Sequence, residues 1–213
     1  MSELKHVIAE KLLAINAVIL NPDEPFTWSS GLKAPIYCDN RITLSYPDVR
    51  SAFADALSAL VRRHFPDAEV IAGTATAGIP HAAWVSERLR LPMVYVRSSA
   101  KAHGKKKQIE GLIPRGRKVV VIEDLISTGA SVLAAVAALR KAGALVLGAA
   151  AIFTYGLNGT AERFEAASVP YYTLTDFSAL IEVAKEKKVI DNGGLKRLEK
   201  WYRDPWDPDW RVG

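Results

Sequence analysis

Apolar residues recur at helical spacing at the start of the chain. They stand three or four positions apart at Leu4, Val7, Ile8, Leu12 and Ile15. This spacing predicts an amphipathic helix over about residues 2–16. Prolines are frequent between residues 21 and 48, which predicts a looped, partly extended segment. Pro47 and Asp48 then mark the beginning of a second helix, which is expected to end near His64.

The middle of the chain alternates between short β-rich runs and helical patterns. The β-rich runs are Glu69–Ala72, Met93–Arg97, Lys118–Ile122 and Leu145–Phe153. Helical patterns stand between them at residues 79–89 and 130–141. This alternation predicts βαβ units and therefore an α/β fold, with a parallel sheet and helices on both faces. Because such sheets bind ligands beyond the carboxyl ends of their strands, the loops after the strands are the candidates for function.

The C-terminal part departs from this alternation. Residues 176–188 have a helical pattern, and Gly193 and Gly194 are expected to separate it from a final helix. The tail has too many prolines and acids for regular structure. Two of its aromatic residues, Trp206 and Trp210, are expected to cover an apolar patch.

The composition is that of a globular protein. Of the 213 residues, 49% are hydrophobic and 24% are charged, which excludes a disordered, collagen-like or disulfide-rich chain. The length predicts one domain with additions, or at most two small domains. Lys and Arg number 28 against 23 Asp and Glu, a net charge of +5. The position of the positive charges must therefore decide between nucleic acid and a small anion as the partner.

The distribution of cysteine and of charge favours the cytoplasm. Cys38 is the only cysteine, so an intrachain disulfide cannot form and a reducing compartment is expected. Glu3 and Lys5 interrupt the first apolar run, unlike the core of a signal peptide. Arg140 and Lys141 interrupt the longest apolar stretch, so we expect neither a membrane span nor a membrane partner.

The segment KVVVIEDLISTGAS, residues 118–131, carries the strongest chemical signal. Two acids, Glu123 and Asp124, stand where a buried strand is expected to end. The chain then turns into a helix through the small residues Ser127, Thr128 and Gly129. A small-residue loop at a helix start binds anions, and carboxylates suit sugar hydroxyls, magnesium or a transient positive charge. The combination predicts a phosphorylated sugar as ligand.

Two other interpretations of this region were weighed. The first is an ordinary turn after two helix-leading acids, which explains poorly why adjacent acids follow a buried strand. The second is a P-loop, because Gly111 and Gly116 have the corresponding glycine spacing. That spacing precedes its strand instead of following it, and the P-loop is excluded.

A basic segment follows the strand predicted at residues 93–97. Arg97, Lys101 and His103 stand beside Gly104, which favours a lid whose cations close over a dense anion such as pyrophosphate. A solvated basic loop is the simpler alternative. The glycine-bounded run at residues 73–78 is a second candidate for anion contacts, although a tight turn would look the same.

These segments resemble those of a known family. Residues 118–131 resemble the phosphoribosyl-pyrophosphate signature of the type I phosphoribosyltransferases. The R-x-x-x-K-x-H-G spacing at residues 97–104 closely resembles the catalytic loop of the orotate phosphoribosyltransferases within that group. Residues 26–41 resemble their base-site segment, and residues 73–80 their pyrophosphate loop. The resemblance extends over nearly the whole chain.

The resemblance implies a fold and a reaction. The fold would be a parallel-sheet type I phosphoribosyltransferase core, at about residues 48–153, with a small hood from about 1–47 and 154–213. The whole chain, 1–213, would form a single domain. The reaction would transfer the phosphoribosyl group from 5-phospho-α-D-ribose 1-diphosphate (PRPP) to orotate. Its products would be orotidine 5′-monophosphate and diphosphate, in the biosynthesis of the pyrimidine nucleotide UMP.

The resemblance also implies roles for residues. Lys101, His103 and Asp124 would be catalytic, and Ser127 would also lie next to orotate. The residues implied in PRPP binding are Arg97, Lys101, His103, Glu123, Asp124, Leu125, Ile126, Ser127, Thr128, Gly129, Ala130 and Ser131. Magnesium would be bound mainly through PRPP and water, with no metal site made by protein ligands. A homodimer is implied, because in this family the loop that bears Lys101 and His103 reaches into the neighbouring subunit's site.

The chain departs from the family where orotate is bound. Ser29 stands where many members have a lysine, and Tyr155 and Gly156 stand where they have an arginine. Lys33, Arg41 or backbone N–H groups of the turn after Ser29 are the alternatives, and no spacing argument selects among them.

Two other functions remain to be distinguished from orotate transfer. A phosphoribosyltransferase for another base would share the donor signature. A non-catalytic PRPP-binding regulator could bind nucleic acid through its basic surface, but it would lack the cations of the lid or add a DNA-binding segment. Neither feature is found, so no nucleic-acid partner is expected.

Overall fold

A six-stranded sheet organises the fold. The structure is a computed structural model and describes residues 2–28, 30–98 and 108–211. The order of the strands in the sheet is β10-β9-β8-β5-β6-β7. Their bounds are β5 (Val70–Thr74), β6 (Met93–Val96), β7 (Ile109–Glu110), β8 (Lys118–Ile126), β9 (Leu145–Thr154) and β10 (Tyr171–Asp176). The pairs β5–β6, β5–β8 and β8–β9 are parallel, whereas β7 is antiparallel to β6. The carboxyl ends of four strands therefore lie at one edge.

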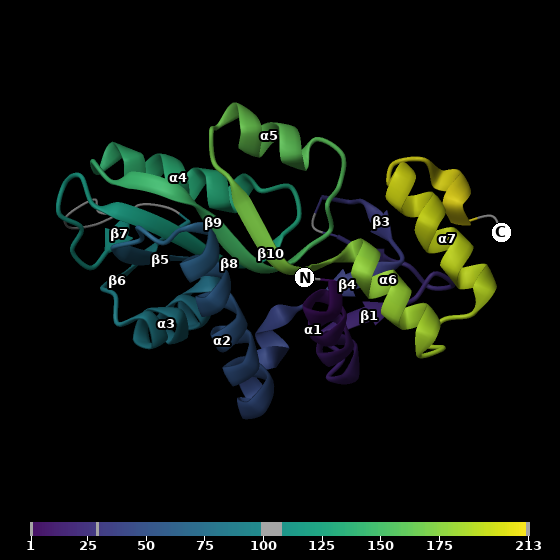
Figure 1. The fold of residues 1–213 in the computed structure, drawn as a ribbon. Coiled ribbons are helices and arrows are strands. Elements are labelled where there is room, and N and C mark those ends of the chain that lie inside the picture. The colour runs from purple at the N-terminus through teal and green to yellow at the C-terminus, as the bar shows by residue number, and fades with distance from the viewer. Residues whose placement is uncertain (1, 29, 99–107, 212–213) are drawn as a thin grey trace. The chain divides into compact units, whose positions relative to one another are not determined.

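Helices cover both faces of this sheet, as the alternating sequence predicted. Figure 1 shows α2 (Pro47–His64) and α3 (Gly78–Leu89) on one face, and α4 (Ala130–Lys141) and α5 (Thr160–Ala166) on the other. Successive β8 side chains point to opposite faces. Val119 and Val121 pack in a core cluster with Val132 and Val136 of α4. The interleaved residues of β8 are equally buried, so the sheet has an apolar core on each side.

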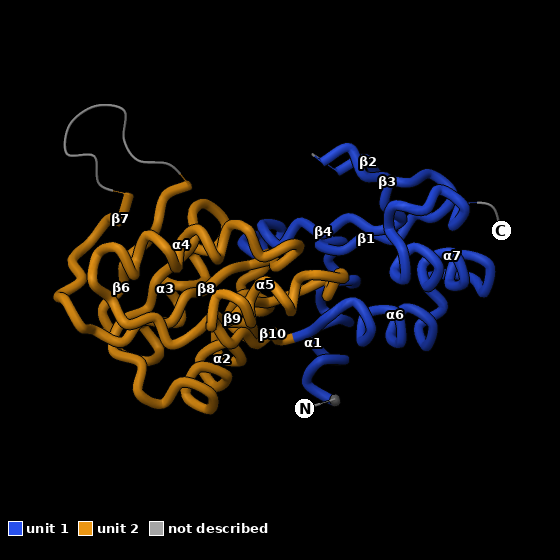
Figure 2. Tube along the Cα trace, turned by 90° about the horizontal axis from the view of Figure 1, so that it is seen from above, with its two compact units in different colours: residues 1–45, 175–213 blue, residues 46–174 orange. Residues whose placement is uncertain are grey.

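The chain divides into two compact units, coloured separately in Figure 2. Unit 2 comprises residues 46–174 and contains most of the sheet. Unit 1 comprises residues 1–45 and 175–213. Its elements are α1 (Ser2–Ala14), β1 (Val18–Leu20), β2 (Phe26–Thr27), β3 (Lys33–Ala34), β4 (Ile36–Cys38), η1 (Asn40–Ser45), α6 (Phe177–Glu186), α7 (Asn192–Arg203) and η2 (Pro208–Arg211). Helix α5, which the sequence assigned to the hood, belongs to the unit that contains the sheet.

Unit 1 is built around the indole of Trp201. This side chain is fully buried, and its Nε1 donates a hydrogen bond to the carbonyl oxygen of Lys33 at 3.2 Å. The rings of Trp28 and Phe177 lie 5.7 and 5.6 Å from it, centre to centre. One residue of α7 thus connects both ends of the chain within this unit.

Strand β8 is longer than predicted. The sequence predicted its end at Ile122, with Glu123 and Asp124 beyond it, but both acids lie inside the strand. The reason is β9, which continues the parallel ladder and pairs with β8 as far as Ile126, opposite Thr154. Backbone pairing with a long neighbour overrides the low strand propensity of acidic residues.

The C-terminal predictions were partly wrong. Gly193 and Gly194 do not separate two helices but lie in the first turn of α7. Asp191 explains this, because its side chain accepts a hydrogen bond from the Gly194 N–H at 2.7 Å and caps the helix. The tail, expected to be irregular, forms η2. Trp210 is buried as predicted, whereas Trp206 is 70% exposed.

None of the helices in the described part of the chain is both long enough and apolar enough to cross a membrane.

Two glycines should respond oppositely to replacement by alanine. A Cβ at Gly193 would meet only the Asp191 Oδ1 atom, at 3.5 Å, so Gly193→Ala should raise the free energy of unfolding by about 0.5–1 kcal/mol. A Cβ at Gly148 in β9 would collide with the Pro170 carbonyl and the Phe65 ring. Gly148→Ala should therefore lower the free energy of unfolding by about 1–3 kcal/mol. Urea denaturation measures both changes, and equal signs would contradict this account of the packing.

Candidate active site

The loop after β8 begins where the parallel strands end. Ser127 and Thr128 lead to Gly129, which precedes the first residue of α4 and has a φ of 80°. This left-handed conformation favours glycine. A Cβ at Gly129 would also collide with the ring of Phe164 in α5. The small residues that the sequence interpreted as an anion loop therefore adopt a close-packed turn at a helix start.

Glu123 is buried at the end of β8. Only 5% of its surface is exposed, and Ser131 Oγ donates a hydrogen bond to its Oε2 at 3.0 Å. The Asp124 N–H donates to its Oε1 at 3.1 Å. Burial, together with the neighbouring charge of Asp124, raises the pKa of Glu123 to about 8, against a smaller opposing effect of the Thr74 hydroxyl. Burial therefore favours the neutral form of Glu123 and makes it harder for the two adjacent acids to be charged together.

Three other residues implied in PRPP binding, Leu125, Ile126 and Ala130, have apolar side chains that cannot form hydrogen bonds to the ligand. Ile126 is buried in the core, and its carbonyl accepts hydrogen bonds from the Thr154 hydroxyl at 2.9 Å and the Tyr155 N–H at 3.2 Å. Leu125 is half-buried in the strand, and Ala130 has only a methyl group. Neither the side chain nor the carbonyl of Ile126 is therefore open to a ligand.

Arg97 lies at the carboxyl end of β6. Its backbone N–H donates to the Gln108 carbonyl at 2.9 Å, and Gln108 Nε2 donates to the Arg97 carbonyl at 3.0 Å. Its guanidinium Nη1 lies 3.5 Å from Glu110 Oε1, so part of its charge is balanced by an acid. Lys101 and His103 lie outside the described residues.

A small cavity joins two parts of the predicted PRPP site. Its volume is about 110 Å³. The lining residues are Thr74, Ala75, Val96, Arg97, Ser98, Gln108, Ser131, Ala134 and Ala135. Arg97 and Ser131, which are distant in the sequence, therefore face the same space at the carboxyl edge of the sheet.

The predicted pyrophosphate loop connects β5 to α3. The Ala75–Thr76 peptide is cis, and the Ala75 N–H donates to the Val96 carbonyl at 2.8 Å. A Cβ at Gly73 would lie 2.9 Å from that of Ala82, and one at Gly78 would lie 2.6 Å from the Ile122 carbonyl oxygen. Close packing of α3 on the sheet explains both glycines, and anion contacts by this loop stay a prediction.

The predicted base-site segment lies in unit 1. Ser29 lies outside the described residues. Arg41 donates two hydrogen bonds to Asp39, at 2.6 and 2.7 Å, and this contact lowers the pKa of Asp39. Lys33 Nζ instead contacts the neutral hydroxyl of Thr27, at 2.5 Å. Tyr155, at the position of the family's arginine, is buried and supplies no positive charge.

Helix α5 contacts the loop at residues 127–129, and the sequence analysis did not predict this helix. The Thr160 hydroxyl donates to the Ser127 carbonyl at 3.1 Å, and Arg163 Nη1 donates to the Thr128 carbonyl at 3.3 Å. A helix of seven residues is too short to show a clear helical periodicity in the sequence. The only local signal was Gly159, which has a φ of 82° and precedes the helix.

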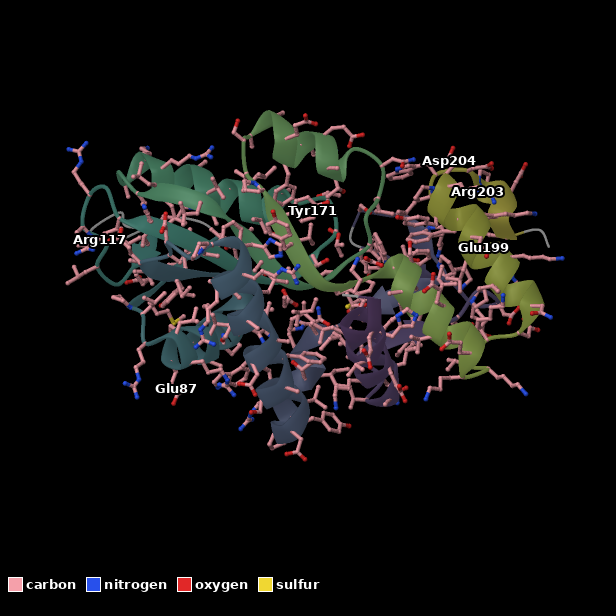
Figure 3. The ribbon with its side chains drawn as sticks, in the orientation of Figure 1. Glu87, Arg117, Tyr171, Glu199, Arg203 and Asp204 are labelled. Atoms are coloured by element: carbon pink, nitrogen blue, oxygen red, sulfur yellow. The ribbon has the colours of Figure 1, made fainter. Side chains whose placement is uncertain are left out.

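The opposite edge of the sheet has a different character. Arg117, labelled in Figure 3, donates to Glu69 Oε1 at 2.6 Å. The Lys118 N–H donates to the other carboxylate oxygen at 2.8 Å. These contacts, the one from Lys118 above all, lower the pKa of Glu69. The acid at this edge is stabilised in its charged form, whereas Glu123 at the carboxyl edge is kept neutral.

Comparison with known proteins identifies the family. The family model for the phosphoribosyl transferase domain matches residues 44–179. The chain is 63% identical over 202 residues to the orotate phosphoribosyltransferase of Bacillus caldolyticus. The aligned region covers 95% of this chain and 98% of that protein. The chain is 59% identical over 207 residues to the orotate phosphoribosyltransferase of Bacillus subtilis, covering 97% and 96%. The chain belongs to the orotate phosphoribosyltransferases. The family and enzyme class predicted from the sequence motifs are confirmed.

Solved structures confirm the type I phosphoribosyltransferase fold of this orotate phosphoribosyltransferase. The orotate phosphoribosyltransferase of Aeropyrum pernix has a TM-score of 0.75 and 28% identity, over 86% of this chain and 99% of that one. The Mycobacterium tuberculosis enzyme in complex with 5-phospho-α-D-ribosyl 1-diphosphate has a TM-score of 0.64 and 25% identity, over 83% and 98%.

Replacing Glu123 should change how stability depends on pH. The pKa of this carboxyl is raised from 4.5 to about 8 in the folded protein, so ionisation of the unfolded chain lowers the stability of the native protein as pH rises between these values. Glu123→Gln removes this titration. Its free energy of unfolding, relative to the wild type, should therefore increase from pH 5 to pH 8 and then level off. Urea denaturation at each pH measures the difference, and a constant difference from pH 5 to 9 would contradict the burial argument.

Proposed function

We propose that the enzyme joins the phosphoribosyl group of PRPP to N1 of orotate at the carboxyl edge of the sheet in unit 2, forming orotidine 5′-monophosphate and diphosphate. One observation carries the location. Strand β8 brings Glu123 and Asp124 to this edge and continues directly into the loop at residues 127–129 and the start of α4. Hydroxyl-binding acids beside an anion loop fit a sugar phosphate. The complex of the Mycobacterium tuberculosis enzyme with PRPP supports this choice of donor.

Each part of the donor has a proposed contact. Glu123 and Asp124 would bind the ribose hydroxyls, with protonated Glu123 able to donate a hydrogen bond and Asp124 to accept one. The segment 127–131 would surround the 5′-phosphate through its N–H groups and hydroxyls, and Ser127 would also lie next to orotate. Arg97 would contact the pyrophosphate, with Lys101 and His103.

The reaction needs charges of opposite sign on the two sides of the ribose. As the bond from C1 to the pyrophosphate oxygen breaks, that oxygen keeps the electron pair and the ribose ring becomes positive. N1 of orotate then forms the new bond to C1 while its N1–H bond breaks, and the proton passes to water. Orotate is already an anion through its carboxylate, so this loss needs no strong protein base. Asp124 supplies negative charge on the ribose side. Lys101, His103 and Arg97 receive the leaving group, and Lys101 or His103 donates the proton that it takes up.

Magnesium is the cofactor proposed for this site. The half-buried carboxylate of Asp124 is a hard oxygen donor of the type that Mg²⁺ prefers. Within residues 2–28, 30–98 and 108–211, no three His, Cys, Asp or Glu side chains are grouped so as to hold a metal ion. We propose that Mg²⁺ binds chiefly to oxygens of PRPP and to water, where it neutralises charge on the diphosphate.

The orotate carboxylate requires a positive or N–H donor group. Arg41 is paired with Asp39, whereas the Lys33 ammonium contacts the neutral Thr27 hydroxyl. Lys33, Arg41 and backbone N–H groups of the turn after Ser29 therefore stay the candidates for this role.

The assembly and location of the enzyme are also proposals. A homodimer with shared active sites follows from the resemblance of residues 97–104 to the family's catalytic loop. The cytoplasm follows from the single cysteine and from the substrate class. The substrates are PRPP and orotate, and we propose neither nucleic acid nor a membrane as a partner.

Conversion of orotate tests the reaction directly. Purified enzyme with PRPP and Mg²⁺ should consume orotate and release one diphosphate for each orotidine 5′-monophosphate formed. Uracil, adenine and hypoxanthine, supplied in turn, should react far more slowly. Faster use of one of these bases would assign the enzyme to another base. No transfer, combined with salt-dependent binding of RNA or DNA, would support the regulator instead.

Lys101→Ala should lower kcat by orders of magnitude in a protein that remains folded and dimeric, because a cation that stabilises the leaving group is lost. Near-normal kcat, with folding verified by circular dichroism, would remove Lys101 from the mechanism.

Mixing this variant with Asp124→Asn tests the shared site. If the loop of one subunit completes the site of the other, each mixed dimer has one intact site. Random exchange should then restore about a quarter of wild-type activity. No recovery in a mixture whose subunits are shown to exchange would contradict sharing.

A further inference from the structure

Helix α5 binds the loop after β8 at consecutive residues. The buried Thr160 hydroxyl donates to the carbonyl of Ser127 at 3.1 Å. The guanidinium of Arg163 donates to the carbonyl of Thr128 at 3.3 Å. Both bonds reach backbone atoms of the loop and neither involves its hydroxyl groups, so α5 fixes how the peptide planes of this loop are oriented.

The orientation of these planes determines where the loop's N–H groups point. In a planar trans peptide, the carbonyl of one residue and the N–H of the next point in opposite directions, and no cis peptide occurs here. Because the carbonyls of Ser127 and Thr128 point to α5, the N–H groups of Thr128 and Gly129 point away from it. The carbonyl of Ile126, bound by Thr154, likewise turns the Ser127 N–H away from β9. Successive N–H groups facing one side are the arrangement that binds an anion.

A third residue of α5 holds the end of the loop. Phe164 is buried and occupies the space that a side chain at Gly129 would need. The centre of its ring lies 4.2 Å from that of Tyr171 on β10, labelled in Figure 3, so the two rings pack against each other. Gly129 in turn accepts a hydrogen bond from the Leu133 N–H at 3.0 Å, in the first turn of α4. Packing against α5 therefore also determines where α4 begins.

We infer that Thr160 and Arg163 are positioning residues for the 5′-phosphate of the donor. They act through the backbone of residues 127–129, not by touching the phosphate. The ligands affected are those that carry a phosphate monoester on the ribose 5′ position. Binding of pyrophosphate does not depend on the hydrogen bonds from Thr160 and Arg163. This inference rests on the proposed function, since it concerns the phosphate loop of that site.

The chain offers a matched control. Arg140 also donates guanidinium hydrogen bonds to two consecutive carbonyls, those of Ala167 at 2.8 Å and Ser168 at 3.1 Å. These carbonyls follow α5 and lie outside residues 127–129. Arg140→Met therefore removes the same charge and the same kind of bond as Arg163→Met, but at residues that follow α5 and not at residues 127–129.

Binding of two probes separates positioning from general damage. Calorimetry would measure the Kd of ribose 5-phosphate and of pyrophosphate, both with Mg²⁺, for the full-length enzyme. Thr160→Val keeps the shape and charge of the side chain but lacks the hydroxyl. Loss of one hydrogen bond to the loop should weaken ribose 5-phosphate by about five- to tenfold. Pyrophosphate should bind as in the wild type, and KM for PRPP should rise more than kcat falls.

The remaining variants make each outcome decisive. Thr160→Ser should recover wild-type affinity, and Arg163→Met should weaken ribose 5-phosphate where Arg140→Met does not. If Thr160→Val fails to fold, the pair of arginine variants carries the test, because both side chains are at the surface. Equal weakening of both probes, or unchanged ribose 5-phosphate binding, would overturn the inference. Absence of orotate conversion by the wild type would overturn the proposed function instead, because ribose 5-phosphate binding is measured without orotate.

Discussion

The parallel pairing of β8 with β9 is the interaction on which the site depends. This ladder continues to the Ile126–Thr154 pair, so the acids of β8 lie inside the sheet until its carboxyl edge. It also determines where the chain leaves β9 and hence where α5 returns to the loop. A shorter ladder would expose Glu123 and leave the carbonyls of residues 127 and 128 without their partners from α5. The catalytic edge and the helix that supports it are consequences of one strand pair.

Burial divides the two neighbouring acids into different roles. Glu123 has its oxygens occupied by Ser131 and the Asp124 N–H, and removal from water raises its pKa to about 8. In the proposed site, Asp124 would therefore supply most of the negative charge on the ribose side, and Glu123 would act chiefly as a hydrogen-bonding group. The sequence identified both acids as candidates but did not distinguish them, because a sequence does not show how much solvent reaches each carboxylate.

Much of the fold and of the donor site was predictable from local patterns. The bounds of α2 and α3 and the starts of β6, β8 and β9 follow the apolar periodicity closely. The end of β8 and the first turn of α7 did not follow it. The first is set by pairing with β9, and the second by the Asp191 cap. The replacement for the family's orotate cations was left open, because the contacts of Arg41 and Lys33 with Asp39 and Thr27 involve side chains that no spacing rule relates.

The sequence by itself determined the family and the chemistry. Residues 97–104 and 118–131 carry the types and spacing of groups that a sugar diphosphate requires, and these are properties of short, contiguous segments. Tertiary structure decided the ionisation of Glu123, the pairing of Arg97 with Glu110, and the support of the loop by Thr160, Arg163 and Phe164. Each of these depends on contacts between groups that are distant in the sequence. The strength of such contacts is determined by burial and geometry, which only the folded chain provides.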